Sequence, residues 1–282
     1  MRKNESATFI LAVLCAVIVS APCVYSQSEV AEEVRWKELD GTGGKALAEG
    51  RTADAEKAWK DAVQIAQRFG PGDGRFIISL NNLGELYQSQ GKYADAEPYR
   101  QRALELMEQQ LGPEHPLVVE GLDNLAKLYW LQGKHSAAEP LAKKLLTIVE
   151  KLAGPEHPNT AQVLNNLAEV YKAQGRYAEA DNAHKHALAI RENALGESPE
   201  VAQSLTNLAE LYRAQGKYSE AEPLYKRALA IGERIFGSEH ADVVRIQEKL
   251  AQALRSMNRR AEADKLEAQV KTIRAKQGKP SP

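Results

Sequence analysis

The chain has 282 residues, with 37 Lys and Arg against 38 Asp and Glu, so its formal net charge is −1 at pH 7. This balance lacks the basic excess of nucleic-acid-binding proteins, and we expect no nucleic-acid partner. Apolar residues make up 43% and charged residues 27% of the chain. That composition is ordinary for a folded protein with a buried core.

The first 26 residues have the layout of a secretory signal and differ from the rest of the chain. Arg2 and Lys3 precede an apolar run over residues 9–19, and small residues follow it. The run is shorter than the roughly 20 residues of a membrane span, which favours a cleaved signal over an uncleaved anchor. We therefore expect a signal peptide over residues 1–26, no membrane span in the mature chain, and export to the bacterial periplasm or the medium.

Both cysteines, Cys15 and Cys23, lie within this segment. The mature chain would then have no disulfide, thiolate nucleophile or thiol metal ligand. Lipidation at Cys23 is the alternative, but Pro22 stands where bacterial lipoprotein signals have a small residue. The only Asn-x-Ser/Thr sequon is at Asn4, which favours a bacterial envelope over a eukaryotic secretory route.

Residues 27–76 form a degenerate copy of the repeat that follows, and we expect them to cap the array. Residues 50–56 match residues 91–97 in their Gly-x-x-Ala-Asp-Ala-Glu pattern. The first helix of this copy, around Trp36 to Glu49, is expected to be interrupted by the Gly-Thr-Gly-Gly stretch at 41–44, because glycine disfavours helix. Atypical terminal copies are usual in repeat proteins.

A block of eight residues, Leu-Asn-Asn-Leu-Gly-Glu-Leu-Tyr at 80–87, recurs along the chain. Three close copies and one weaker copy follow at spacings of 42, 42, 41 and 42 residues. A regular repeat of this length predicts a stack of similar units, each in contact mainly with its neighbours. The predicted segments are four close units at about 77–111, 119–153, 161–195 and 202–236, a C-terminal copy at 243–274, and a disordered tail at 275–282.

Each unit is predicted to be a helical hairpin. In the 202–236 unit, apolar residues recur at three- and four-residue spacing in both halves. Gly216 separates the halves, and the same slot in the last copy holds Asn258; both residues favour the left-handed conformation that ends a helix. Pro223 lies early in the second half and is expected in the first helical turn, where no intrahelical bond is lost.

The loop between units reads Gly-Pro-Glu-His-Pro at 112–116 and 154–158, with an eroded copy at 237–241. Each of these three loops contains one histidine: His115, His157 or His240. Histidines spaced in this way are expected to help start the next helix and not to share a metal. His184 and His186 are two residues apart on a helix and do not face each other. The sequence has no nucleophile triad, phosphate loop or dinucleotide motif, so we expect no catalysis, cofactor or metal.

These motifs resemble the tetratricopeptide repeat over about residues 36–274, in the version found in kinesin light chains. The signal segment and the lack of a long heptad region argue against a resemblance to a whole kinesin light chain. The resemblance implies an all-α, right-handed α-solenoid of stacked hairpins. It also implies a concave groove lined by the first helices, which binds a protein or peptide partner.

The predicted groove residues fall in rows one helical face away from the buried positions. Asn82, Asn124, Asn166 and Asn207 form an amide row that continues as Lys249; a second row begins at Glu85, and a third contains Gln88, Trp130, Lys172, Arg213 and Arg255. Asparagine can pair with a peptide backbone, whatever its sequence. The alternative for the amides is bracing of neighbouring helices, and for Trp130 it is packing against a neighbouring helix.

The cationic side chains Lys172, Arg213 and Arg255 would meet an acidic peptide or a free carboxylate. Their alternative is a solvated face balanced by Glu169 and Glu210. The function predicted is therefore an exported, non-catalytic scaffold that binds protein or peptide in its groove. The alternative is a non-catalytic accessory or carrier subunit of an envelope enzyme or assembly complex.

Overall fold

The computed structural model describes residues 27–278, which form α-helices, one short 3-10 helix and no strand. The predicted all-α class is confirmed, and the expected signal segment lies outside the described residues. The helices are α2 (Gln27–Ala48), α3 (Thr52–Ala66), η1 (Gln67–Phe69), α4 (Gly74–Ser89), α5 (Tyr93–Leu111), α6 (Pro116–Leu131), α7 (His135–Ala153), α8 (Pro158–Ala173), α9 (Tyr177–Leu195), α10 (Pro199–Ala214), α11 (Tyr218–Phe236), α12 (Ala241–Ser256) and α13 (Arg260–Lys276).

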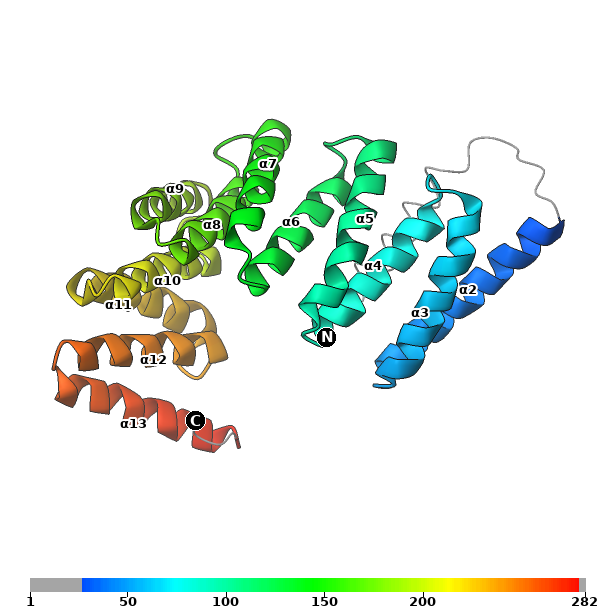
Figure 1. The fold of residues 1–282 in the computed structure, drawn as a ribbon. Coiled ribbons are helices and arrows are strands. Elements are labelled where there is room, and N and C mark those ends of the chain that lie inside the picture. The colour runs from blue at the N-terminus through cyan, green and yellow to red at the C-terminus, as the bar shows by residue number, and fades with distance from the viewer. Residues whose placement is uncertain (1–26, 279–282) are drawn as a thin grey trace. The chain divides into compact units, whose positions relative to one another are not determined.

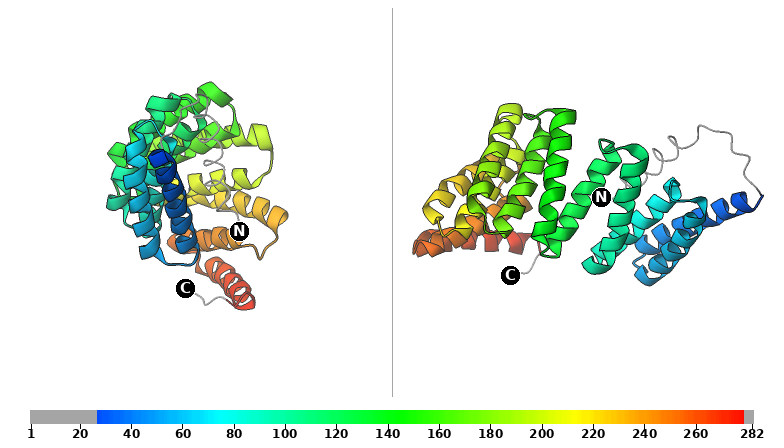
Figure 2. Two further views of the ribbon diagram at one scale, coloured as in Figure 1. Left: turned by 90° about the vertical axis from the view of Figure 1, so that its right-hand side faces the viewer. Right: turned by 45° about the horizontal axis from the view of Figure 1, so that its top comes forward.

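The described part of the chain divides into two compact units, residues 27–141 and 142–278, and the division falls inside α7. In the first unit, α2 and α3 form one hairpin, α4 and α5 the next, and α6 packs against α5 (Figure 1). In the second unit, the hairpins are α8 with α9, α10 with α11, and α12 with α13 (Figure 2). Each unit is therefore a short series of antiparallel helical hairpins.

The hairpin turns are closed by left-handed residues, as predicted. Gly91 has φ +72°, and Asn258, with φ +61°, is the one non-glycine residue of positive φ between residues 27 and 278. The Lys92 N–H donates to the Tyr87 carbonyl over 2.9 Å, which satisfies an acceptor at the end of α4. The turn chemistry read from the sequence thus fixes where each first helix stops.

The loop histidines cap the helices that follow them, which confirms their predicted role. The Nδ1 atoms of His115, His157 and His240 accept from backbone N–H groups at distances of 3.2, 3.1 and 3.2 Å. Each bond satisfies one of the unpaired donors at a helix N-terminus. His184 is buried and His186 is exposed, so the two do not form a pair. Between residues 27 and 278, no cluster of His, Cys, Asp and Glu is placed to hold a metal ion.

The expected interruption of the first helix at residues 41–44 is wrong. Helix α2 runs without a break from Gln27 to Ala48. Gly43 faces α3, and a Cβ atom there would lie 2.5 Å from Nε1 of Trp59. Gly43 therefore lets the Trp59 ring pack closely against α2. The Thr42 hydroxyl donates a hydrogen bond to the Glu38 carbonyl, one turn earlier in the same helix, over 2.6 Å.

The prolines of the second helices lie one turn later than expected. Helix α11 begins at Tyr218, so Pro223 lies in the second turn and removes one intrahelical hydrogen bond. Pro98 in α5 and Pro140 in α7 occupy the same place. The carbonyls that lose a donor belong to exposed residues, so water can replace the missing bond; they are Ala94, Ser136 and Ser219.

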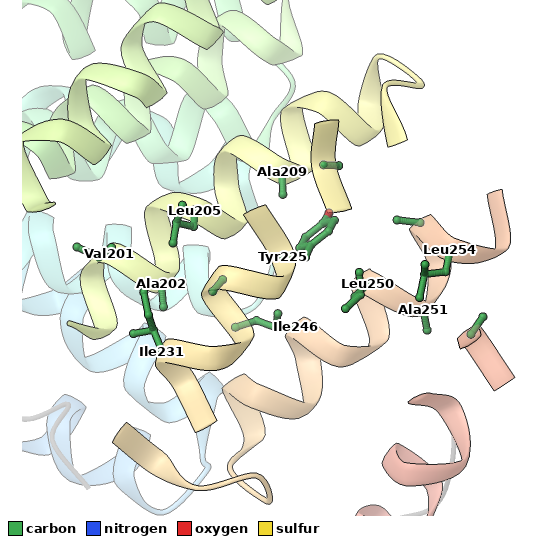
Figure 3. Packing of buried hydrophobic residues seen from close by; sticks show 14 residues of the cluster. Val201, Ala202, Leu205, Ala209, Tyr225, Ile231, Ile246, Leu250, Ala251 and Leu254 are labelled. Carbon is green, nitrogen blue, oxygen red and sulfur yellow. The ribbon is translucent and has the colours of Figure 1, made fainter. Parts of the chain in front are cut away.

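The second unit has its largest apolar cluster between α10, α11 and α12. Figure 3 shows Tyr225 of α11 between Ala209 of α10 and Leu250 of α12. Tyr225, Leu205 and Ala209 have no exposed surface. The small side chain of Ala209 lets α11 approach α10 closely. This packing fixes the orientation of α10, and with it the direction in which the opposite face of the helix points.

Candidate functional site

Each unit contains one hollow at the same place in the repeat. The α4–α6 hollow of the first unit has a volume of about 450 Å³, and the α10–α12 hollow of the second has about 500 Å³. Each is bounded by two successive first helices and by the second helix between them. Part of the predicted groove rows lines these hollows: Asn82, Glu85, Gln88 and Asn124 in the first unit, and Asn207 and Lys249 in the second.

The amide row reaches both hollows. Asn82 of α4 and Asn124 of α6 line the α4–α6 hollow together, although they are 42 residues apart. Asn207 of α10 and Lys249 of α12 occupy the corresponding places in the α10–α12 hollow. All four are therefore placed at a recessed surface and not in a helix-to-helix core, in keeping with the face assigned to them from helical periodicity.

Part of the amide row also braces the helices. The Asn82 Nδ2 donates to the Asp40 Oδ1 on α2 over 2.7 Å. On α8, Asn166 accepts through its Oδ1 from Gln162 Nε2 at 3.0 Å, one turn earlier in the same helix. Bracing, the alternative considered for these amides, thus operates at Asn82, and it leaves the Asn82 carbonyl for other partners.

Trp130 is exposed at the end of α6. It retains 40% of its accessible surface, and its ring lies 6.5 Å from that of His135 at an angle of 57°. The next residue, Leu131, also retains 40% and lines the α4–α6 hollow. Leu131 is therefore an exposed apolar side chain at the hollow, while the exposed Trp130 lies at the same end of α6 against His135.

The predicted cationic row is engaged in ion pairs. Lys172 Nζ lies 2.5 Å from Glu169 Oε2, and Arg213 lies 2.8 Å from Glu210 Oε2, both one turn away on the same helix. Arg255 does not follow them. It bonds to Asp264 at 2.7 Å and to Glu267 at 2.6 Å on α13, within its own hairpin. The balance by Glu169 and Glu210 that was considered as the alternative is present at Lys172 and Arg213, whereas Arg255 is balanced by Asp264 and Glu267.

The second helices contribute polar side chains that the row analysis missed. Arg100 of α5 lines the α4–α6 hollow, and the corresponding residues in later copies are Ala142, His184 and Tyr225. The Arg100 Nη1 donates to Asn81 Oδ1 at 3.2 Å. Its stem lies across Gly84, where a Cβ atom would be 2.9 Å from the Arg100 Cδ. One signal in the sequence could have revealed this contact. Gly84 and Arg100 both differ from the residues at the corresponding positions of the later copies.

A buried polar network lies inside the second unit. Arg191 of α9 keeps only 2% of its surface exposed, and its Nη1 donates to the Glu200 carbonyl and to Ser204 Oγ, each at 2.9 Å. Its Nη2 donates to Gln162 Oε1 at 2.6 Å. These contacts join α8, α9 and α10, so they serve the packing of the unit and not a reaction.

Successive helical hairpins with matched turns, caps and hollows define an all-α helical-repeat protein. The chain belongs to the tetratricopeptide repeat family, whose model matches residues 75–151, 137–193 and 200–276. Proteins of this fold are typically non-catalytic scaffolds for protein–protein interaction. No curated protein shows significant sequence similarity to the chain. None of the helices between residues 27 and 278 combines the length and apolar character needed to cross a bilayer.

Solved structures share the fold. The kinesin-light-chain TPR-like repeats of Podosopora anserina are 29% identical, with a TM-score of 0.63, over 74% of this chain and 97% of that one. BtubC (BKLC) of P. vanneervenii is 23% identical, with a TM-score of 0.63, over 89% and 94%. A tetratricopeptide repeat protein of Parabacteroides merdae is 22% identical, with a TM-score of 0.62, over 85% and 80%. The expected likeness to kinesin-light-chain-type repeats is confirmed.

Proposed function

We propose that the chain is an exported, non-catalytic scaffold that binds an extended segment of a partner protein along the faces of its first helices. The observation that carries this proposal is the shared hollow of Asn82 and Asn124. Two amides from successive first helices are presented side by side at a recess, each with donor and acceptor atoms. That arrangement suits the N–H and C=O groups of an extended peptide backbone.

Binding of this kind depends on a surface that is already formed. The residues of α4 and α6 are held by their buried faces, since Leu83, Leu86 and Leu122 have no exposed surface. A partner then orders only its own chain, which limits the entropy lost on association. Leu131 adds exposed apolar surface to the hollow that the amides line, and Trp130 adds more at the same end of α6. The proposed function is therefore recognition without turnover.

The test selects random dodecapeptides displayed on phage against the full chain, and then measures the affinity of the selected peptides by fluorescence anisotropy. Replacing Asn82 and Asn124 together with Ala is expected to weaken binding roughly tenfold or more, at about 1 kcal/mol for each hydrogen bond. The matched control replaces Asn182 and Asn193, which are exposed on α9 and away from both hollows. Equal affinity for both double variants would contradict groove binding.

Export is a separate part of the proposal and rests on the charged, apolar and small-residue order of residues 1–26. Expression in a Gram-negative host, followed by fractionation and intact-mass measurement, tests it. We expect a periplasmic or secreted product that has lost residues 1–26. An intact chain in the cytoplasmic fraction would overturn export and leave the binding proposal unaffected.

A further inference from the structure

Two carboxylates face the α4–α6 hollow from opposite walls. Glu85 is on α4 and Glu120 is on α6, and both side chains are exposed and line the hollow. Within residues 27–278, neither carboxylate has a hydrogen bond or ion pair. Most other acidic groups on this array are paired, so two unpaired ones at a single recess call for an explanation.

The corresponding carboxylates of the second unit are neutralised. Glu169 and Glu210 occupy the place of Glu85, and each is paired with the cation three residues later on its own helix. In the first unit that later position is Gln88, so no such pairing is available to Glu85. The buried Oε1 of Gln88 accepts no hydrogen bond and adds a third acceptor to the lining of the hollow.

Arg100 is the one cationic side chain among the described residues that line this hollow. Burial lowers the pKa of Arg100, while the charges of Glu85 and Glu120 raise it. Burial raises the pKa of Glu120; Arg100 lowers it, and Glu85 and Asp123 raise it by repulsion. One guanidinium thus faces two carboxylates that repel each other, and the hollow has one uncompensated negative charge.

We infer that the α4–α6 hollow receives a lysine or arginine side chain of the bound partner segment, with its charged head at Glu85, Glu120 and Gln88. This inference rests on the proposed function, because it assigns side-chain specificity to the same surface. Met107 and Leu117 line the hollow and offer apolar contact to the methylene stem of such a side chain. An acidic side chain would meet two like charges, Glu85 and Glu120, and a single cation, Arg100, whose Nη1 already donates to Asn81.

The test uses the dodecapeptides selected on the full chain. We expect one position of the selected set to be enriched in Lys and Arg. Exchange of that residue for norleucine, or the double variant E85Q/E120Q, should each weaken binding roughly tenfold, as expected of a charge-assisted contact. Affinity should also fall with added salt. The control E38Q/E105Q removes the same charge from exposed sites on α2 and α5 and should leave affinity unchanged.

The outcomes separate the two proposals. Selected peptides without a basic position, or with an acidic one, would overturn this inference; so would unchanged affinity in E85Q/E120Q. If the selected peptides still bind more weakly to the variant in which Asn82 and Asn124 are both replaced, the proposed function stands. If no dodecapeptide is selected, or if the Asn double variant binds as the wild type does, the proposed function itself fails. Circular dichroism and Tm are recorded for E85Q/E120Q, because the variant also removes the charges that face the buried Arg100, and its affinity is compared in the folded state.

Discussion

Asn82 on α4 donates to Asp40 on α2 over 2.7 Å, so this bond joins the first helices of two successive hairpins. One side chain therefore joins neighbouring hairpins while it lines the α4–α6 hollow. In the proposed function Asn82 would serve both stacking and recognition, so a loss of binding in its variants must be separated from a loss of stability.

Asp40 gives a pH-dependent test of this brace. Burial raises the pKa of Asp40, and the hydrogen bond from Asn82 lowers it in part. A carboxyl group whose pKa is higher in the folded than in the unfolded state stabilises the fold at pH values below the unfolded pKa, which is near 4. This stabilisation is lost as the pH rises through the pKa of the folded state. Urea unfolding of wild type and D40N should therefore show a difference that moves in favour of D40N between pH 3.5 and pH 7. A difference independent of pH would contradict this.

Glu210 should show the opposite pH dependence. Burial raises the pKa of Glu210, but the contacts with Arg213, Tyr225 and Lys249 lower it by more than burial raises it. The pKa is therefore lowered to about 2. A carboxyl group whose pKa is lower in the folded than in the unfolded state stabilises the fold at pH values above the unfolded pKa. This stabilisation is lost as the pH falls toward 2. E210Q is expected to lose up to about 3 kcal/mol at pH 7 and much less at pH 2.5, measured by urea unfolding. An equal loss at both pH values would show that the charge is unimportant.

The glycines of α2 give a matched set of substitutions. G43A places a methyl group against Trp59 and should destabilise the chain by about 1–3 kcal/mol. At Gly41 and Gly44 a Cβ atom meets open space within the same helix. G41A and G44A should each stabilise by about 0.5–1 kcal/mol, since alanine favours helix. Thermal melts in one buffer compare the three. Destabilisation by G41A and G44A as large as that of G43A would contradict the assigned packing role.

Arg191 holds the second unit together through several acceptors. R191A leaves the Gln162, Glu200 and Ser204 acceptors without this donor and opens a cavity, so a loss of about 3–5 kcal/mol is expected. R191M keeps more of the volume, and the chain itself has Met107 at the corresponding place. It should lose about 1–2 kcal/mol less than R191A in urea unfolding. Equal losses would show that filling the space contributes little.

Periodic features of the repeat were predictable because they depend on local chemistry. Glycine turns and histidine caps act within a few positions, as Gly91 and His157 show. The continuous α2 was not predictable, since the role of Gly43 depends on Trp59, 16 residues later in the chain. Arg100 was missed because its place beside Asn81 depends on how the hairpin closes. Arg255 was assigned to the row by spacing, but acidic partners on α13 decide its contacts.

The most direct measurement is the affinity of selected dodecapeptides for the full chain and its N82A/N124A variant, with circular dichroism and Tm recorded alongside. We expect roughly tenfold or greater weakening in N82A/N124A, with helicity preserved and N182A/N193A binding as the wild type does. Unchanged affinity in a folded N82A/N124A variant would contradict the claim that the first-helix amides form a binding surface.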